Sequence, residues 1–171
     1  MLTSALVRGV TTACLTFCIS DTACQTLERR CSPPEQRQPR DFRRTLNFVS
    51  TALIFNGPAS VAIIAAVDSL PLQTAAMKAI VNMAVEPARI GGTLVTFQLL
   101  SGQGFKGALE LLQAELWNIY TKGLLLWTPA LWISYRFLSL RDRAPFLYLL
   151  GAFWDTFVSY RANQRDAARL K

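Results

Sequence analysis

The feature that most restricts this chain is an uncharged run, residues 45–67, with the sequence TLNFVSTALIFNGPASVAIIAAV. It lies between Arg44 and Asp68. A helix rises about 1.5 Å per residue, so a helical run of this length crosses the roughly 30 Å hydrocarbon core of a bilayer. Its polar residues are Thr, Ser and Asn, whose side chains can hydrogen-bond to their own helix backbone. The run therefore predicts a membrane-spanning helix in a membrane protein.

Composition supports a membrane protein and excludes several classes of enzyme. The chain is 51% hydrophobic and 17% charged, whereas a typical soluble domain is about 25% charged. It contains no histidine. This excludes His-ligated metal sites, His-ligated haem, and Ser–His or Cys–His nucleophile pairs. We therefore predict a protein that is not an enzyme and that carries no metal or cofactor.

The cysteines and the net charge have ordinary explanations in a membrane protein. Cys14, Cys18, Cys24 and Cys31 show no CxxC spacing, and three of them fall within an apolar segment. Small buried residues are the favoured interpretation over a redox or metal role. The net charge of +7 is not accompanied by interleaved aromatic and basic residues, so we predict no nucleic-acid partner. Basic residues that flank the membrane helices account for the positive net charge.

Four more apolar segments and one amphipathic segment complete the expected fold. Residues 108–122 place Leu109, Leu112, Leu116 and Ile119 on one helical face, which suits a helix at the membrane interface or on the bundle. We predict one membrane domain over residues 1–171: an all-α, integral membrane helical bundle of four to five apolar helices plus this short amphipathic helix. The apolar segments besides 45–67 are 3–27, 74–101, 123–140 and 145–160.

The polar connections bear on orientation and processing. Residues 28–44 form a Pro-containing linker with six arginines and three acids, and residues 161–171 form a basic tail. If all five apolar segments cross, both basic regions lie on the matrix or cytosolic side; with four crossings they oppose each other. The acid-poor start is typical of a mitochondrial presequence and of a first membrane helix. The loop 102–107 matches GxGxxG without the strand of a dinucleotide fold, so we predict a flexible turn.

Two short patterns stand out in the first half of the chain. The sequence ISDTACQTLE carries Asp21, Gln25 and Glu28 at the end of the first apolar segment. An Arg–Thr pair then opens the uncharged run, which reaches Gly57 and Pro58 near its middle. Each pattern is weak alone, so their order and spacing along the chain carry the information.

A third pattern lies near the C-terminus, where Arg143 is followed eleven residues later by Trp154 in WDTFVSY. Together the three patterns resemble those of the Mpv/PMP family, which includes a peroxisomal membrane protein and mitochondrial inner-membrane relatives. The resemblance extends over about residues 10–165. It implies a protein of the mitochondrial inner membrane, with the peroxisomal membrane as the alternative location.

The chain also departs from the family pattern at polar positions. After its Gly–Pro pair the family typically has His and then Trp–Tyr, whereas the corresponding residues here are Val61, Ile63 and Ile64. A family Asp–Gln pair corresponds to Val81 and Asn82. Family members have been proposed to form non-selective pores, and the missing side chains are ones that a wet path would use. The resemblance therefore implies a relative with an apolar interior.

Two groups of polar residues nevertheless lie at membrane depth. Asp21, Gln25 and Glu28 recur at i, i+4 and i+7, so they lie on one helical face. Glu86 and Arg89 are three residues apart and can pair directly. Ionisable groups inside a bilayer cost roughly 2.5 to 3.5 kcal/mol each on insertion scales, and they normally face partners or water. Both groups therefore need an explanation.

Two interpretations of these groups stay open. They are either an internal set of salt bridges that locks helix packing, with Arg136 as a further candidate partner, or a polar pathway for solutes or protons. The aliphatic substitutions favour the first. We therefore predict a non-catalytic mitochondrial inner-membrane protein, a structural accessory subunit of a larger respiratory or ATP-synthase assembly; a small non-selective pore or solute channel is the alternative. Expected partners are other membrane subunits and membrane lipids, cardiolipin included.

Overall fold

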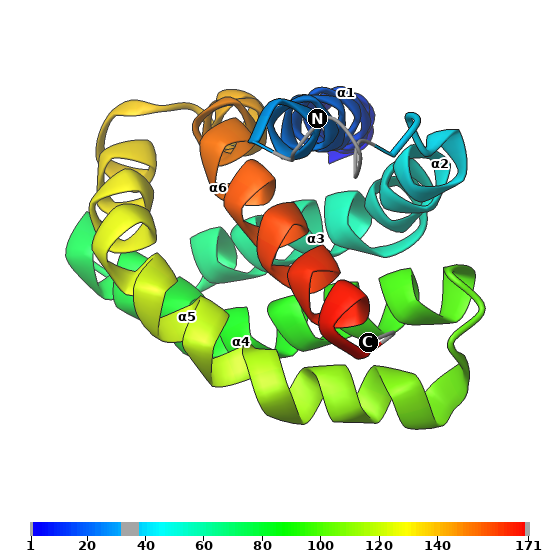
Figure 1. Cartoon of the computed structure of the whole chain (residues 1–171). Coiled ribbons are helices and arrows are strands. Elements are labelled where there is room, and N and C mark those ends of the chain that lie inside the picture. Colours follow the sequence, from blue (N-terminus) through cyan, green and yellow to red (C-terminus); the bar gives the residue numbers. More distant parts are fainter. Residues whose placement is uncertain (1, 32–37, 170–171) are drawn as a thin grey trace.

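The computed structural model describes residues 2–31 and 38–169, with side chains over 3–30, 38–154 and at 156. Every element in these described residues is helical, which confirms the predicted all-α fold (Figure 1). The elements are α1 (Leu2–Cys31), α2 (Phe42–Thr51), the π-helical turn η2 (Ala52–Asn56), α3 (Gly57–Ser69), α4 (Ala75–Leu100), α5 (Gly104–Phe137) and α6 (Leu140–Arg169).

The uncharged run forms one nearly continuous rod made of α2, η2 and α3. Pro58 has no N–H to donate back to the preceding turn, and the Gly57 N–H bonds to the carbonyl of Ala52, five residues earlier. This i→i+5 bond defines the π turn. A Cβ on Gly57 would lie 3.1 Å from the Cα of Val10, so glycine allows α1 to pass close to the rod.

Two helical stretches, Thr3–Arg30 and Phe42–Ser69, are long and apolar enough to cross a membrane. They correspond to the predicted segments 3–27 and 45–67. The crossings predicted for residues 74–101, 123–140 and 145–160 stay predictions. Within the bundle, α4 packs along α5 and α1 packs along α6, while α6 also contacts α3 and lies across the front of the view in Figure 1.

Helix α5 corrects the prediction of a separate amphipathic helix at residues 108–122. That segment and the apolar segment 123–140 form one 34-residue helix, because the residue at their junction, Gly123, weakens a helix without ending it. The helix begins at Gly104, so only the first two residues of the GQGFKG loop lie outside it; Gly102 has φ +80° and Gly104 φ +67°. Both glycines there adopt a left-handed conformation that other residues rarely tolerate.

The buried face of α5 also differs from the predicted one. Leu109 is 43% exposed, and Leu112 and Leu116 are only half-buried. The face turned into the protein is made by Ala108, Leu111, Glu115 and Ile119. Apolar residues of a membrane helix can face lipid as well as protein, so an apolar stripe does not by itself identify the packed side.

Helix α6 begins at Leu140, five residues before the predicted apolar segment. The Ser139 carbonyl accepts hydrogen bonds from the N–H groups of Asp142 and Arg143, which starts the helix. Its backbone continues to Arg169 and so includes most of the predicted tail. In the predicted linker between α1 and α2, residues 32–37 lie outside the described residues.

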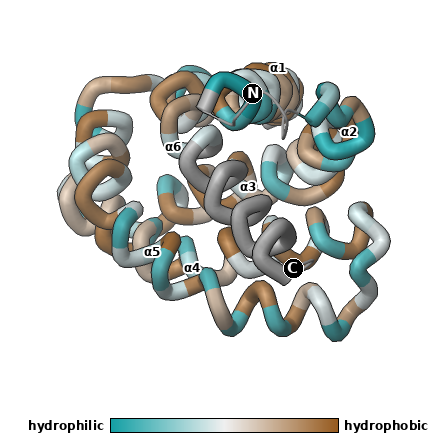
Figure 2. Tube along the Cα trace, viewed as in Figure 1, coloured by the Kyte–Doolittle hydropathy of each residue, from teal (hydrophilic) through white to brown (hydrophobic). Residues whose placement is uncertain are grey.

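Aromatic contacts join three helices in the main core. The Phe17 and Phe48 rings lie 5.4 Å apart, and Phe97 meets Phe48 edge-on at 4.7 Å. Hydrophobic residues are not confined to this core, as the brown stretches along several helices in Figure 2 show. Leu125 and Phe153 are 87% and 83% exposed. Such exposed apolar side chains suit contact with lipid or with another membrane protein.

Candidate functional site

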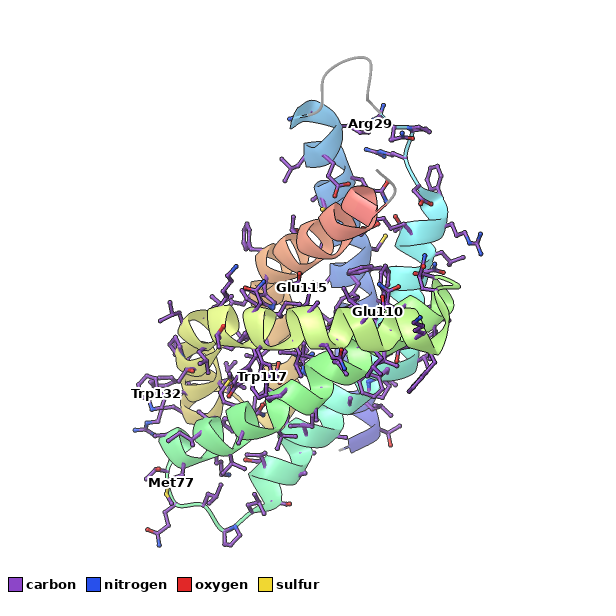
Figure 3. All side chains as sticks on the ribbon, turned by 60° about the horizontal axis from the view of Figure 1, so that its bottom comes forward. Arg29, Met77, Glu110, Glu115, Trp117 and Trp132 are labelled. Atoms are coloured by element: carbon purple, nitrogen blue, oxygen red, sulfur yellow. The ribbon has the colours of Figure 1, made fainter. Side chains whose placement is uncertain are left out.

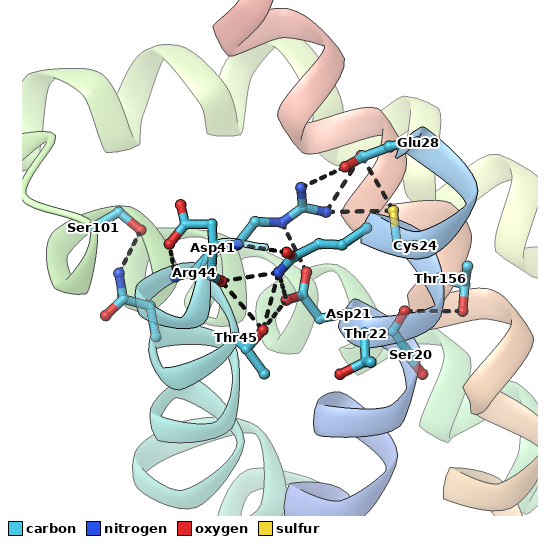
Figure 4. A network of polar contacts seen from close by, with 12 residues as sticks. Ser20, Asp21, Thr22, Cys24, Glu28, Asp41, Arg44, Thr45, Ser101 and Thr156 are labelled. Atoms are coloured by element: carbon cyan, nitrogen blue, oxygen red, sulfur yellow. Dashed lines mark hydrogen bonds and ion pairs between the residues drawn. The ribbon is translucent and has the colours of Figure 1, made fainter. Parts of the chain in front are cut away.

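The first polar site links the end of α1 to the start of α2. Asp21 is fully buried, and its Oδ1 lies 2.8 Å from the Nε of Arg44. The Nη1 of Arg44 lies 2.8 Å from the Oε2 of Glu28, so one guanidinium serves two carboxylates (Figure 4). The prediction that Asp21 and Glu28 share a face is confirmed. Their partner is Arg44, whereas Arg136 is exposed and stacks on Phe137.

Amide and hydroxyl groups complete this site. Gln25 Nε2 donates to Asp21 Oδ2 at 2.8 Å, and Gln25 Oε1 accepts from the Asp41 N–H at 2.8 Å. The Thr45 hydroxyl donates to the same Asp21 oxygen at 2.7 Å. Asp41 also caps α2 by accepting from the Arg44 N–H at 3.0 Å. We call Asp21, Gln25, Glu28, Arg44 and Thr45 the Arg44 network; it ties two helices together through satisfied polar groups.

The second polar site is the predicted pair on α4. The Nε of Arg89 lies 3.1 and 3.0 Å from the two carboxylate oxygens of Glu86, and its Nη2 also bonds to that carboxylate. The direct pairing predicted from their three-residue spacing is confirmed. Glu86 is buried and Arg89 half-buried. Unlike the Arg44 network, this ion pair lies within one helix.

Glu86 and Arg89 line a pocket of about 50 Å³. Its polar lining also includes Asn56, Ser60 and Asn82, and its remaining wall is apolar and aromatic. A second pocket of about 60 Å³ shares Phe17, Asn56 and Arg89 with the first and also contacts Thr51 and Thr93. Each space holds a few water molecules and no larger solute.

The pocket lining only partly fits the expected apolar interior. Val61 and Ile64 are buried in one hydrophobic cluster, and Ile63 and Val81 pack half-buried against a second one around Met83. These aliphatic residues behave as predicted. Asn82, by contrast, keeps a polar role and donates to the Tyr135 hydroxyl at 2.8 Å. The interior is therefore apolar at Val61, Ile63, Ile64 and Val81, and it stays polar at Asn82.

Asn56 is the functional candidate that the sequence interpretation overlooked. Its Oδ1 accepts from the Tyr148 hydroxyl at 2.8 Å, and its Nδ2 donates to Thr93 Oγ1 at 2.8 Å. The Tyr148 hydroxyl also lies 3.0 Å from the Asn56 carbonyl. A buried amide is costly without such partners. The signal was present, because Asn56 is one of only two amide side chains in the uncharged run, residues 45–67.

Arg143 belongs to a third polar site, where α3, α4 and α6 meet. Its Nη1 lies 2.8 Å from Asp68 Oδ1, and Lys78 Nζ lies 2.7 Å from the same oxygen. The guanidinium of Arg143 also stacks over the Tyr135 ring at 4.9 Å. The motif spacing identified Arg143, and the uncharged run ends at Asp68. Neither pattern predicted the contact between Lys78 and Asp68.

The other motif residues have packing roles in separate places. Trp154 packs against the cluster of Leu94, Leu111 and Ile119. It lies three helical turns from Arg143, so the two residues do not form one site. Gly57 and Pro58 act through the backbone at the π turn described above.

Glu115 is a buried acid that the sequence interpretation did not single out. It is 1% exposed, and the Asn118 amide donates to its Oε2 at 2.9 Å. Figure 3 labels Glu115 and its exposed neighbour Glu110 on the same helix. A carboxylate on an otherwise apolar face gave no pattern from which burial could be inferred.

Among the described cysteines only Cys24 fits the interpretation as a small buried residue. Cys18 is exposed and Cys14 half-buried, and Cys31 has no described side chain. Cys24 Sγ lies 3.4 Å from Arg44 Nη2, at the edge of the Arg44 network. No group of three or more potential metal ligands occurs within the described part of the chain.

These sites and the fold define a class: a small all-α membrane protein whose buried charges pair with one another. Residues 98–159 match the Mpv17 / PMP22 family. Over 128 residues the chain is 21% identical to the mitochondrial inner membrane protein Mpv17 of Caenorhabditis briggsae, which covers 72% of this chain and 71% of that protein. No solved structure matches. These matches agree with the predicted resemblance to the Mpv17 / PMP22 family, and the named relative is a mitochondrial inner membrane protein.

Proposed function

We propose that this protein is a non-catalytic structural subunit of a larger complex in the mitochondrial inner membrane. The observation that carries the proposal is the mutual pairing of its buried charges. Arg44 serves Asp21 and Glu28, and Arg89 serves Glu86. A group that conducts ions or protons must be able to exchange its partner for the passing species. Charges held by fixed partners instead stabilise helix packing.

The size of the internal pockets supports the same proposal. Spaces of about 50 and 60 Å³ hold a few waters and leave no room for a metabolite. The aliphatic residues Ile63 and Ile64 line the first of them. Aliphatic side chains cannot replace the hydration shell of a passing solute, so they hinder conduction through this part of the bundle.

The outer surface supports a partner role. Trp117, Leu125 and Phe153 are large apolar side chains that are 62%, 87% and 83% exposed. In a bilayer such residues face lipid or neighbouring helices, and close helix contact then adds van der Waals packing. A respiratory or ATP-synthase assembly supplies neighbours of this kind. The choice between them stays part of the proposal.

Purification and reconstitution test this function. In mitochondria solubilised with a mild detergent, we expect the native protein to migrate in a complex far larger than its own 19.0 kDa. Liposomes that contain the purified protein should show no more flux of small neutral solutes than protein-free liposomes. A free monomer in mitochondrial extracts would contradict the accessory role, and reproducible flux would contradict the non-conducting role.

A small pore is the second candidate, and one observation favours it. The two pockets share Asn56 and Arg89, so a rearrangement of few side chains would join them. If the protein conducts, flux should fall in a Glu86→Gln variant and persist in a Glu110→Gln variant, because Glu110 is exposed. Equal flux in wild type and both variants would exclude conduction through these pockets.

A further inference from the structure

An open, basic pocket lies where α1 ends and the chain enters α2. Arg29 and Arg30 belong to the last turn of α1, and Arg40 directly precedes Asp41, the N-cap of α2. Together with Thr26, these arginines line a pocket of about 270 Å³. Figure 3 labels Arg29 at this end of the molecule, far from Met77 at the opposite end.

The positive charge of this pocket is not neutralised by its described lining, which includes no acidic residue. Arg40 Nη2 donates to the Thr26 hydroxyl at 3.4 Å, which ties the approach to α2 to the last turns of α1. The neighbouring carboxylates have other tasks: Glu28 binds the guanidinium of Arg44, and Asp41 caps α2. Three guanidinium groups therefore converge on one open space.

The position of the pocket indicates which kind of anion can reach it. The two candidate membrane spans, Thr3–Arg30 and Phe42–Ser69, end and begin at this pocket. The ends of membrane-spanning helices lie at the level of the lipid headgroups. Basic side chains at a helix C-terminus also interact favourably with the helix dipole. That effect accounts for Arg29 and Arg30 but not for Arg40, which lies just before α2.

We propose that Arg29, Arg30 and Arg40 bind the phosphate of an anionic phospholipid. Guanidinium groups bind phosphate oxygens bidentately, and three of them suit a lipid with two phosphates, such as cardiolipin, better than a lipid with one. The binding site lies apart from the Glu86–Arg89 pocket. It is therefore expected whether the protein is an accessory subunit or a pore.

Native mass spectrometry of the detergent-purified protein tests this site. Cardiolipin is titrated into wild type, into the triple variant Arg29→Gln, Arg30→Gln, Arg40→Gln, and into a control triple variant, Lys106→Gln, Arg136→Gln, Arg141→Gln. The control removes the same charge at exposed positions elsewhere. We expect the pocket variant to bind cardiolipin at least about tenfold more weakly, and the control within about threefold of wild type.

Further arms separate the site from its alternatives. Equal weakening in both triple variants would overturn the proposal, because net charge alone would then explain binding. Displacement of cardiolipin by millimolar inorganic phosphate would point to a free anion and would also overturn it. If the glutamine variant loses helical circular dichroism, the Arg→Lys triple at the same positions decides. Weaker binding by that charge-conserving variant supports the guanidinium site, and unchanged binding rejects it.

Discussion

The Arg44 network and the Glu86–Arg89 pair are both buried sets of charges, but they are built differently. The Arg44 network joins α1 to α2 across more than a dozen residues of chain, and its acceptor Asp21 is bonded to three side chains. Glu86 and Arg89 lie on one helix and face a small pocket. The first arrangement fixes the relative position of two helices, whereas the second keeps polar groups beside a space that admits water.

The largest effect is expected at Arg44. Replacing it in an Arg44→Met variant leaves the fully buried Asp21 carboxylate without its cation, which costs roughly 3 to 5 kcal/mol of unfolding free energy. Arg43→Met is the matched control, because Arg43 is its exposed neighbour on the same turn; its effect should stay within about 0.5 kcal/mol. Denaturant titration in mixed micelles measures both. Equal losses would mean that the network does not hold the helices.

Substitutions in the Glu86–Arg89 pair should lower the free energy of unfolding less than Arg44→Met does. Glu86→Leu and Arg89→Met should each cost about 3 kcal/mol, at the low end for a broken buried pair, because the pocket can hydrate the remaining charge. The double variant should be milder than either single change, since no unpaired charge is left. The same titrations supply the four values of a double-mutant cycle. A double variant less stable than both singles would show that this is not a structural ion pair.

A third experiment separates apolar packing from charge on the same helix. A Cβ on Gly92 would lie 2.1 Å from the Phe55 ring, whereas one on Gly91 would meet only the flexible end of Leu112 at 3.2 Å. Gly92→Ala should therefore cost about 1 to 3 kcal/mol, and Gly91→Ala should cost less. Combining Gly92→Ala with Phe55→Leu should recover part of the loss. Without such recovery, the close approach of η2 and α4 would not explain the effect.

The smallest effect is expected at the hydrogen bonds around Asn56. Tyr148→Phe removes one hydroxyl and should cost about 1 kcal/mol. Combined with Asn56→Leu, it should show a measurable coupling energy, because the two side chains contact each other directly. Thermal unfolding followed by circular dichroism gives the four stabilities. Purely additive effects on stability would show that the Tyr148 hydroxyl and the Asn56 side chain do not stabilise each other.

The sequence predicted those contacts that are local along a helix. The Glu86–Arg89 pair follows from a three-residue spacing alone, and the shared face of Asp21, Gln25 and Glu28 follows from helical periodicity. The partner of that face was not predictable in the same way. Arg44 reaches Asp21 only because α2 folds back beside α1, and such a contact depends on the connection between two helices.

Periodicity failed on α5 for a different reason. In water, an apolar stripe marks the side of a helix that is packed against the protein. In a membrane protein, lipid tails accept apolar residues equally well. Leu109 and Leu125 accordingly point outward, whereas the carboxylate of Glu115 points inward. Hydropathy alone therefore identified the helix but did not identify its packed face.

The π turn before Pro58 has a consequence for how this chain tolerates insertions and deletions. A π turn holds one residue more than an α turn, and each α-helical residue rotates the chain by about 100°. Deleting one residue within Ala52–Asn56 would convert the π turn into an α turn, which completes about the same rotation with one residue fewer. Val61 and Ile64 would therefore still face the core, whereas the same deletion in the regular part of α2 would turn α3 by about 100° and carry both residues away from it. The π turn thus absorbs one residue of chain length without changing which face of α3 is buried.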